Sequence, residues 1–261
     1  MGRRLGQHFL TGQWAARKLV EAVSVRPGET ILEIGPGKGA LTEELLATGA
    51  PVVAVEKDPP LVRHLHDRFT KSIIERQLTI VEDDIRNFDP KKTGLTSYVV
   101  AANIPYYITG EIIRQFLTCM TPPRAMALLV QKEVAERIVA RDGKESILSL
   151  SVKAYGVPKI IAKVSRGNFS PPPSVDSAIL LIDGISKEFF NGASEESFFK
   201  VVRAGFAGKR KFLANNLSVV FGKKTAEYAL GACGIGPKAR AEDVPLEKWI
   251  SLTRKLFTGG G

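Results

Sequence analysis

Short apolar runs alternate with amphipathic segments along the first half of the chain. Runs typical of buried strands occupy residues 30–34, 51–55, 78–81, 98–102 and 124–130. Between them, apolar residues recur with helical spacing at 13–23, 40–46 and 133–140. Because strands that alternate with helices form parallel sheets covered on both faces, this pattern predicts an α/β domain.

The pattern changes in the second half. Residues 159–164 and 175–183 are predicted to pair as an antiparallel edge of the sheet, with a proline-rich loop between them. Beyond residue 183 the spacing becomes helical, and glycines separate four segments at 194–206, 209–220, 225–233 and 246–257. We therefore expect an α/β domain over 1–183 and a small all-α domain over 184–261.

A glycine-rich loop follows the first of these strands. It reads Gly35-Pro36-Gly37-Lys38-Gly39 and leads directly into the helix expected at 40–46. Such a loop lets the backbone approach a ligand closely and leaves N–H groups unpaired at the helix start, as in nucleotide-binding units. Its G-x-G-x-G spacing differs from the G-x-G-x-x-G of dinucleotide sites.

Carboxylates follow the next two strands. Glu56 comes 21 residues after Gly35, where a carboxylate can accept hydrogen bonds from both ribose hydroxyls. Asp83 and Asp84 follow the third strand, although an acid there can also be a helix N-cap. Ligands of open α/β sheets bind beyond the carboxyl ends of the strands. Four strand ends are therefore expected to share one crevice, which would bring together Gly35, Glu56, Asp84 and Asn103.

The strand at 98–102 ends in Asn103-Ile104-Pro105-Tyr106. These residues offer an amide oxygen, a carbonyl left unpaired because proline lacks a donor, and a flat ring. Two acceptors and a ring suit the exocyclic amine of a planar base. Taken alone, the four residues could also form an ordinary strand exit.

With these and further motifs, the chain resembles the ribosomal RNA adenine N6-dimethyltransferases, a family of S-adenosylmethionine enzymes. The further motifs are Gly6-Gln7-His8-Phe9-Leu10, Gln131-Lys132-Glu133-Val134, the proline-rich motif FSPPPSVDSA at 169–178, and Ala239-Arg240-Ala241-Glu242. The first motif together with the proline-rich motif is specific to this family. The resemblance implies a Rossmann-like class I methyltransferase sheet, mostly parallel with an antiparallel edge, and a small C-terminal all-α domain.

The resemblance also implies roles for individual residues. The residues that would bind S-adenosylmethionine are His8, Leu10, Gly35, Gly37, Glu56, Asp84, Ile85 and Asn103. The catalytic residues would be Asn103, Pro105, Tyr106 and Phe169. The implied reaction transfers methyl groups to N6 of two adjacent adenines in a loop near the 3′ end of small-subunit ribosomal RNA. Its product is N6,N6-dimethyladenosine, formed during ribosome biogenesis.

The residues themselves suggest how such a reaction proceeds. The lone pair of adenine N6 is delocalised, so a site must favour pyramidal geometry and align the nitrogen with the sulfonium methyl group. The Asn103 side-chain oxygen and a backbone carbonyl of the next two residues can accept the two N–H bonds while Tyr106 stacks on the base. The methylated amine can lose its proton after transfer, so no strong base is needed.

Two further aromatic residues are assigned on weaker grounds. Phe169 precedes a triple proline and is predicted to form a second stacking wall, with core packing as the alternative. Tyr107 is predicted to pack inside the protein.

Two positions depart from the family pattern. His8 stands where many bacterial members have asparagine, but both side chains can form hydrogen bonds, so a cofactor contact is still expected. Glu145-Ser146-Ile147 stands where the family often has a Tyr-x-Arg type of sequence. Whether this loop contacts the substrate is therefore left open.

Charge indicates a nucleic-acid partner. The 261 residues carry a net charge of +10, as expected for a protein that meets phosphate backbones. Residues 184–261 hold 13 Lys and Arg against 7 Asp and Glu, so the smaller domain is the more basic. Within it, Lys209-Arg210-Lys211 and Asn215-Asn216 are predicted to contact RNA, the alternative being a solvated helix start.

Other classes of protein fit less well. No apolar run reaches the ~18 residues of a membrane span, and Cys119 and Cys233 form no Cys-x-x-Cys pair. We expect a cytoplasmic monomer that acts on small-subunit RNA in a pre-ribosomal particle and needs neither metal nor membrane. The alternatives are a non-catalytic assembly or transcription factor, a large-subunit methyltransferase of the macrolide-resistance type, and a DNA adenine methyltransferase. A nicotinamide oxidoreductase is disfavoured by the glycine spacing.

Overall fold

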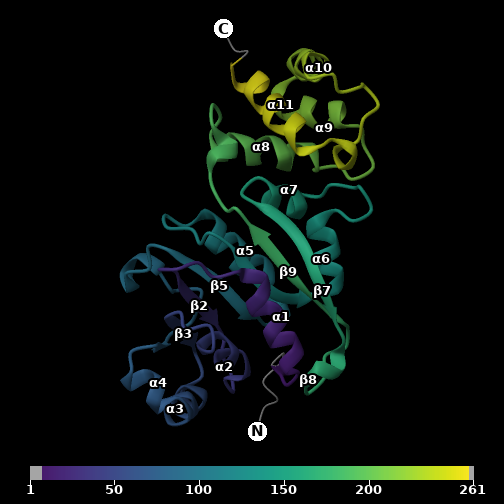
Figure 1. The fold of residues 1–261 in the computed structure, drawn as a ribbon. Coiled ribbons are helices and arrows are strands. Elements are labelled where there is room, and N and C mark those ends of the chain that lie inside the picture. Colours follow the sequence, from purple (N-terminus) through teal and green to yellow (C-terminus); the bar gives the residue numbers. More distant parts are fainter. Residues whose placement is uncertain (1–7, 259–261) are drawn as a thin grey trace. The chain divides into compact units, whose positions relative to one another are not determined.

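The computed structural model describes residues 8–258, which divide into two compact units (Figure 1). The α/β unit comprises residues up to 135 together with 156–185, and the helical unit comprises 136–155 together with residues from 186 onward. The sequence pattern assigns 136–155 to the first domain. In the structure this segment groups with the helical unit, because its helix α7 (Ile147–Lys153) packs against α8 (Glu195–Gly205).

The α/β unit is built on a seven-stranded sheet with the order β4-β3-β2-β5-β6-β9-β7. Five strands run parallel to one another: β2 (Thr30–Ile34), β3 (Val52–Glu56), β4 (Leu78–Glu82), β5 (Tyr98–Asn103) and β6 (Met126–Gln131). β9 (Ser177–Asp183) runs antiparallel to both β6 and β7 (Val157–Val164). The predicted parallel sheet with an antiparallel edge is confirmed.

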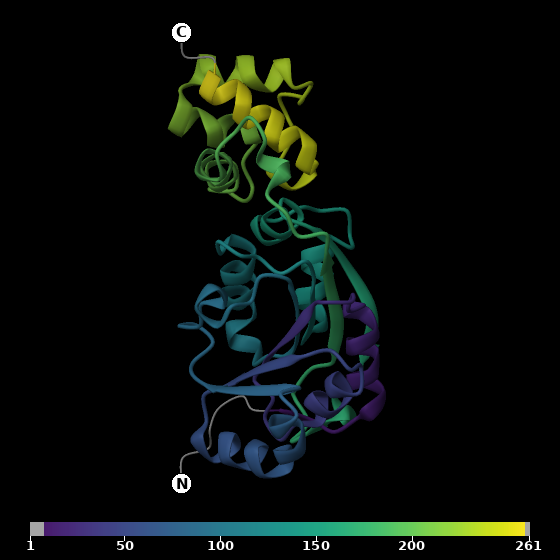
Figure 2. The same cartoon turned by 60° about the vertical axis from the view of Figure 1, so that its left-hand side comes forward.

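Helices cover both faces of this sheet. They are α1 (Gln13–Val23), α2 (Ala40–Leu46), α3 (Pro59–Arg68), α4 (Thr70–Ile74), α5 (Thr109–Thr118) and α6 (Lys132–Val139), the last of which continues into the helical unit. α2 leads from β2 to β3 and α5 leads from β5 to β6, in opposite directions across the sheet. Because such crossovers are right-handed, the two helices lie on opposite faces (Figure 2). The strand order reverses between β2 and β5, and a ligand crevice is expected at that point.

A small two-stranded sheet lies outside the main one. β1 (Phe9–Leu10) pairs antiparallel with β8 (Phe169–Ser170), so that Leu10 is the register partner of Phe169. The pairing joins the first described residues to the proline-rich motif. It therefore brings together two segments that are distant in sequence.

The helical unit contains α8 with α9 (Leu213–Phe221), α10 (Lys223–Ala232) and α11 (Leu246–Thr258). Trp249 of α11 is fully buried, and its indole N–H donates to the Val244 carbonyl oxygen at 3.0 Å. A side chain at Gly205 would collide with the Trp249 ring, so the glycine lets α8 approach α11 closely. No helix in the described part of the chain is long and apolar enough to cross a membrane.

Candidate active site

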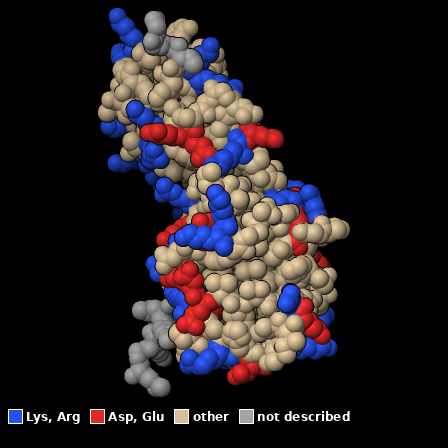
Figure 3. Space-filling view, turned by 90° about the vertical axis from the view of Figure 1, so that its left-hand side faces the viewer, with Lys and Arg blue, Asp and Glu red and all other residues tan. Residues whose placement is uncertain are grey.

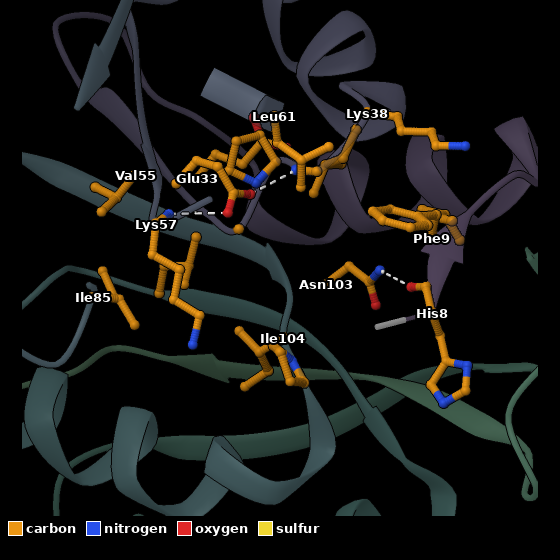
Figure 4. A pocket seen from close by; sticks show the side chains of 18 of the residues that line it. His8, Phe9, Glu33, Lys38, Val55, Lys57, Leu61, Ile85, Asn103 and Ile104 are labelled. Carbon is orange, nitrogen blue, oxygen red and sulfur yellow. Dashed lines mark hydrogen bonds between the residues drawn. The ribbon is translucent and has the colours of Figure 1, made fainter. Parts of the chain in front are cut away.

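A pocket of about 1000 Å³, partly open to solvent, lies at the carboxyl edge of the parallel strands (Figure 4). It is lined by most of the residues that the sequence singles out: His8, Leu10, Gly35, Gly37, Glu56, Asp84, Ile85, Asn103, Pro105 and Tyr106. The expected convergence of the strand ends is therefore present. Gly6 and Gln7 of the first motif lie outside the described residues.

The glycine loop makes a sharp turn from β2 into α2. Gly35, Gly37 and Gly39 have φ angles of 65°, 60° and 83°, a region that favours glycine. A Cβ atom at Gly37 would come within 3.0 Å of the Phe9 ring, and one at Gly39 within 2.5 Å of the Phe69 ring. Side chains at these positions would therefore both strain the turn and displace the rings packed against it.

Glu56 is fixed by backbone donors at the end of β3. Its Oε2 accepts from the Gly37 N–H at 3.1 Å, and its Oε1 accepts from the N–H groups of Lys57 and Asp58 at 2.9 and 3.0 Å. The carboxylate thus ties the glycine loop to the next strand. Glu56 also lines the pocket, and a carboxylate group there is a hydrogen-bond acceptor.

Asp84 presents an ionised acceptor at another part of the pocket wall. Arg86 donates two hydrogen bonds to its carboxylate, from Nε to Oδ1 at 3.0 Å and from Nη2 to Oδ2 at 2.6 Å. These hydrogen bonds, against a smaller opposing effect of burial, lower the pKa of Asp84 to about 2. The side chain can therefore accept, but not donate, a hydrogen bond near neutral pH.

Glu33 is a pocket residue that sequence reasoning missed. It is only 1% exposed and lies within β2, where a carboxylate in an otherwise apolar strand was the available signal. Thr42 donates to its Oε2 at 2.7 Å, while its Oε1 is buried without a hydrogen-bond partner in the described part of the chain. Burial, reinforced by the charge of Glu56, raises the pKa of Glu33 to about 8. Glu33 is therefore mostly protonated at pH 7 and can donate a hydrogen bond.

The amide of Asn103 is oriented by the first described residue. Its Nδ2 donates to the His8 carbonyl oxygen at 3.0 Å. A carbonyl can only accept, so this contact identifies which end of the amide is nitrogen. Figure 4 shows the nitrogen directed at His8 and the oxygen turned the other way. Oδ1 is thereby left as an acceptor on the pocket side.

The proline-rich motif braces two of the pocket residues. The Tyr106 hydroxyl forms a hydrogen bond of 2.6 Å with the Ser177 hydroxyl, and Nδ1–H of His8 donates to the Pro171 carbonyl oxygen at 2.8 Å. The His8 and Tyr106 rings lie side by side, with their centroids 5.9 Å apart. Sequence reasoning missed the role of Ser177, although this serine is part of the quoted motif.

Two aromatic residues differ from the sequence-based expectation. Phe169 is 4% exposed, belongs to the hydrophobic core and does not line the pocket, so the structure shows the packing alternative for this ring. Its pairing with Leu10 explains this position. The packing expected for Tyr107 is wrong, since this side chain is 67% exposed.

The basic run at 209–211 belongs to the helical unit, whereas the pocket residues belong to the α/β unit. The helix expected at 209–220 begins only at Leu213, so the three cations lie in the exposed turn between α8 and α9. Asn216 is buried, and its Nδ2 donates to the carbonyl oxygens of Gly205 and Gly208 at 2.6 and 3.1 Å. The expected RNA contact of Asn216 is therefore wrong, because its amide is used to hold the turn.

Lys and Arg side chains are spread over the helical unit on the face shown in Figure 3, with acidic side chains among them. Part of the basic surplus counted in residues 184–261 is thus visible on this face. In the described part of the chain, no group of three or more His, Cys, Asp or Glu side chains could hold a metal ion.

The departure at Glu145-Ser146-Ile147 has a structural explanation. The Ser146 hydroxyl accepts from the Ser149 N–H at 3.1 Å and the Ser149 hydroxyl accepts from the Ser146 N–H at 2.7 Å, which forms a capping box at the start of α7. Glu145 pairs with Lys153 at 2.6 Å. These residues begin and brace a helix.

The fold and the pocket define a class I methyltransferase of the S-adenosylmethionine-dependent type. Residues 2–257 match the family model described as "Ribosomal RNA adenine dimethylase", and the chain belongs to this family. It is therefore an S-adenosylmethionine-dependent ribosomal RNA adenine dimethyltransferase.

Relatives indicate which ribosomal subunit carries the substrate. A protein of Dehalococcoides mccartyi (strain CBDB1) named ribosomal RNA small subunit methyltransferase A is 41% identical over 95% of this chain and 86% of its own length. A protein of the same name from Moorella thermoacetica is 37% identical over 96% and 91%. These relatives support small-subunit ribosomal RNA as the substrate.

Solved structures agree with the fold. The 23S rRNA methyltransferase ErmE superposes with a TM-score of 0.78 at 28% identity, over 95% of this chain and 99% of that one. A dimethyladenosine transferase from Plasmodium falciparum gives a TM-score of 0.77 at 23% identity, over 94% and 96%. The large-subunit enzyme thus shares the fold, while the small-subunit relatives are closer in sequence.

Proposed function

We propose that the pocket binds S-adenosylmethionine and that Asn103-Ile104-Pro105-Tyr106 holds the target adenine beside it. The observation that carries this proposal is the orientation of the Asn103 amide, whose nitrogen is committed to His8 and whose oxygen is left for the amine. When bound, S-adenosylmethionine supplies an electrophilic methyl group.

The lining of the pocket fits this cofactor. The glycine turn offers a close backbone approach, and Glu56 offers a fixed acceptor for ribose hydroxyls. Asp84 adds an ionised acceptor, whereas the protonated Glu33 adds a buried donor. Acceptors and a donor at separate points suit a ligand that carries amine, hydroxyl and carboxylate groups.

The residues around Asn103 can prepare the adenine amine for attack. The Asn103 Oδ1 and a carbonyl of the next two residues would accept its two N–H bonds, which favours the pyramidal nitrogen of the transition state. Tyr106, tethered by Ser177, would stack on the base. The proton released after transfer can leave to water, so these residues need not include a strong base.

The finer description of the substrate is also part of the proposal. We propose two adjacent adenines, in a loop near the 3′ end of the small-subunit RNA of a pre-ribosomal particle, as targets of a cytoplasmic, monomeric enzyme. The turn at 209–211 would contact the RNA backbone, since it is exposed and strongly basic. An unpaired loop is required because a stacked duplex hides the amine.

The test uses unmethylated small ribosomal subunits, labelled S-adenosylmethionine and mass spectrometry of the digested RNA. The wild type should yield dimethyladenosine, and Asn103→Ala should lower the rate on the order of 100-fold, as for a lost transition-state acceptor. Calorimetry should show cofactor affinity within about tenfold of wild type. Asn191→Ala, an exposed asparagine in the helical unit, is the control and should be fully active. Full activity of Asn103→Ala would refute the assigned role.

A further inference from the structure

Tyr107 is exposed at the rim of the pocket. It lies in a short 3-10 turn, Tyr106–Ile108, whose first and last residues both line the pocket, whereas its own side chain does not. The residue is 67% exposed. A planar aromatic surface of this kind is therefore available to a molecule that approaches the pocket from solvent.

The charged residue that follows the pocket-lining residues Asp84 and Ile85 is already paired. Arg86 is half exposed, and its guanidinium donates to the Asp84 carboxylate at 3.0 and 2.6 Å. The exposed feature of the Tyr106–Ile108 turn is the aromatic ring of Tyr107. The contact that this turn can offer a nucleotide is therefore stacking.

We propose that Tyr107 binds the nucleotide next to the target adenine, by stacking its ring on that neighbouring base. This inference rests on the proposed function, in which the target adenine lies against Tyr106. A base that leaves the stack exposes the face of its neighbour, and an aromatic side chain can cover that face. When two adjacent adenines are methylated one after the other, the adenine that is outside the pocket would stack on the Tyr107 ring.

The test compares Tyr107→Leu, which removes the ring, with Tyr107→Phe, which keeps it. Initial rates on unmethylated small subunits should show kcat/KM lowered roughly tenfold for Tyr107→Leu and nearly unchanged for Tyr107→Phe. Trp14→Leu removes another exposed aromatic ring of the α/β unit and should be nearly unchanged. Cofactor affinity and the thermal unfolding midpoint should match wild type, because the side chain is exposed and outside the pocket lining.

Salt dependence separates stacking from a phosphate contact. The slope of log kcat/KM against log salt should be the same for Tyr107→Leu and wild type, since stacking releases no counterions. A wild-type rate in Tyr107→Leu, an equal loss in Tyr107→Phe, or a flattened slope would overturn the inference while leaving the proposed function intact. If the wild type itself left the adenines unmethylated, the proposed function would fail and this inference with it.

Discussion

At the scale of single residues, hydrogen bonds from distant parts of the chain determine how the pocket side chains point. Asn103 is oriented by His8, and Tyr106 by Ser177, which is fully buried at the start of β9. A ring that stacks on a base must already be in place before the base arrives, because ordering it on binding would cost free energy. Ser177 is therefore a positioning residue.

Removing the Ser177 hydroxyl tests this role. Ser177→Ala should lower kcat severalfold, because the Tyr106 ring loses its tether, while cofactor affinity measured by calorimetry stays at the wild-type value. In a Tyr106→Phe background the hydroxyl contact is already absent, so adding Ser177→Ala should have no further effect on kcat. Additive losses in the double variant would contradict the tether.

Glu33 should make stability depend on pH in an unusual direction. Its pKa is about 8 in the folded protein and 4.5 ordinarily, so between these values the unfolded chain releases a proton that the folded protein keeps. Its contribution is thus fully favourable below pH 4.5 and is lost as pH rises to about 8.

Glu33→Gln removes this titration. Relative to wild type, its free energy of unfolding in urea should rise with pH between 5 and 8, by up to about 1.4 kcal/mol per pH unit. The exposed Glu75→Gln is the control and should keep a constant difference from wild type. Parallel pH profiles for the two variants would show that Glu33 ionises normally.

At the scale of elements, the turn between α8 and α9 shows how a buried amide can shape a basic loop. The Asn216 side chain is not available at the surface, because the N–H bonds of its amide donate to the carbonyl oxygens of Gly205 and Gly208. A Cβ at Gly208 would lie 2.7 Å from Asn216 Oδ1, so glycine is needed there. The cations at 209–211 are consequently presented on an ordered turn.

Charge removal on this turn should weaken RNA binding in a salt-dependent way. Lys209→Ala with Lys211→Ala should lower affinity for small subunits and reduce the slope of log affinity against log salt by about 1.5, as expected for two lost phosphate contacts. Lys18→Ala with Lys71→Ala removes the same charge from the α/β unit, where the two side chains are 41% and 88% exposed. If the slope of log affinity against log salt were the same for the Lys209/Lys211 variant and this control pair, the turn would be solvated and would not contact RNA.

At the scale of the whole molecule, the net charge of +10 and the match over residues 2–257 agree on an RNA-modifying enzyme. The α/β unit is tied together by contacts such as that of Arg124. Its guanidinium binds Glu29 at 2.6 Å and Asp183 at 3.3 Å, and it donates to the carbonyls of Val23 and Ser24. These contacts link the end of α1, the approach to β2 and the end of β9, which no local pattern connects.

The sequence by itself determined the strands of the large sheet and the helices α1 and α2, since apolar periodicity follows burial and the expected ranges of α1 and α2 match the observed ones. It also determined the family and which strand ends converge on the pocket, because the glycine turn and the acids at strand ends follow from chain geometry. The tertiary structure decided the rest. Phe169 became a core residue through the β1–β8 pairing, Tyr107 became exposed, and segment 136–155 joined the helical unit. Glu33 stands in an apolar strand and Ser177 belongs to the proline-rich motif, but their roles depend on burial and on contacts with other segments of the chain, which the local pattern does not show.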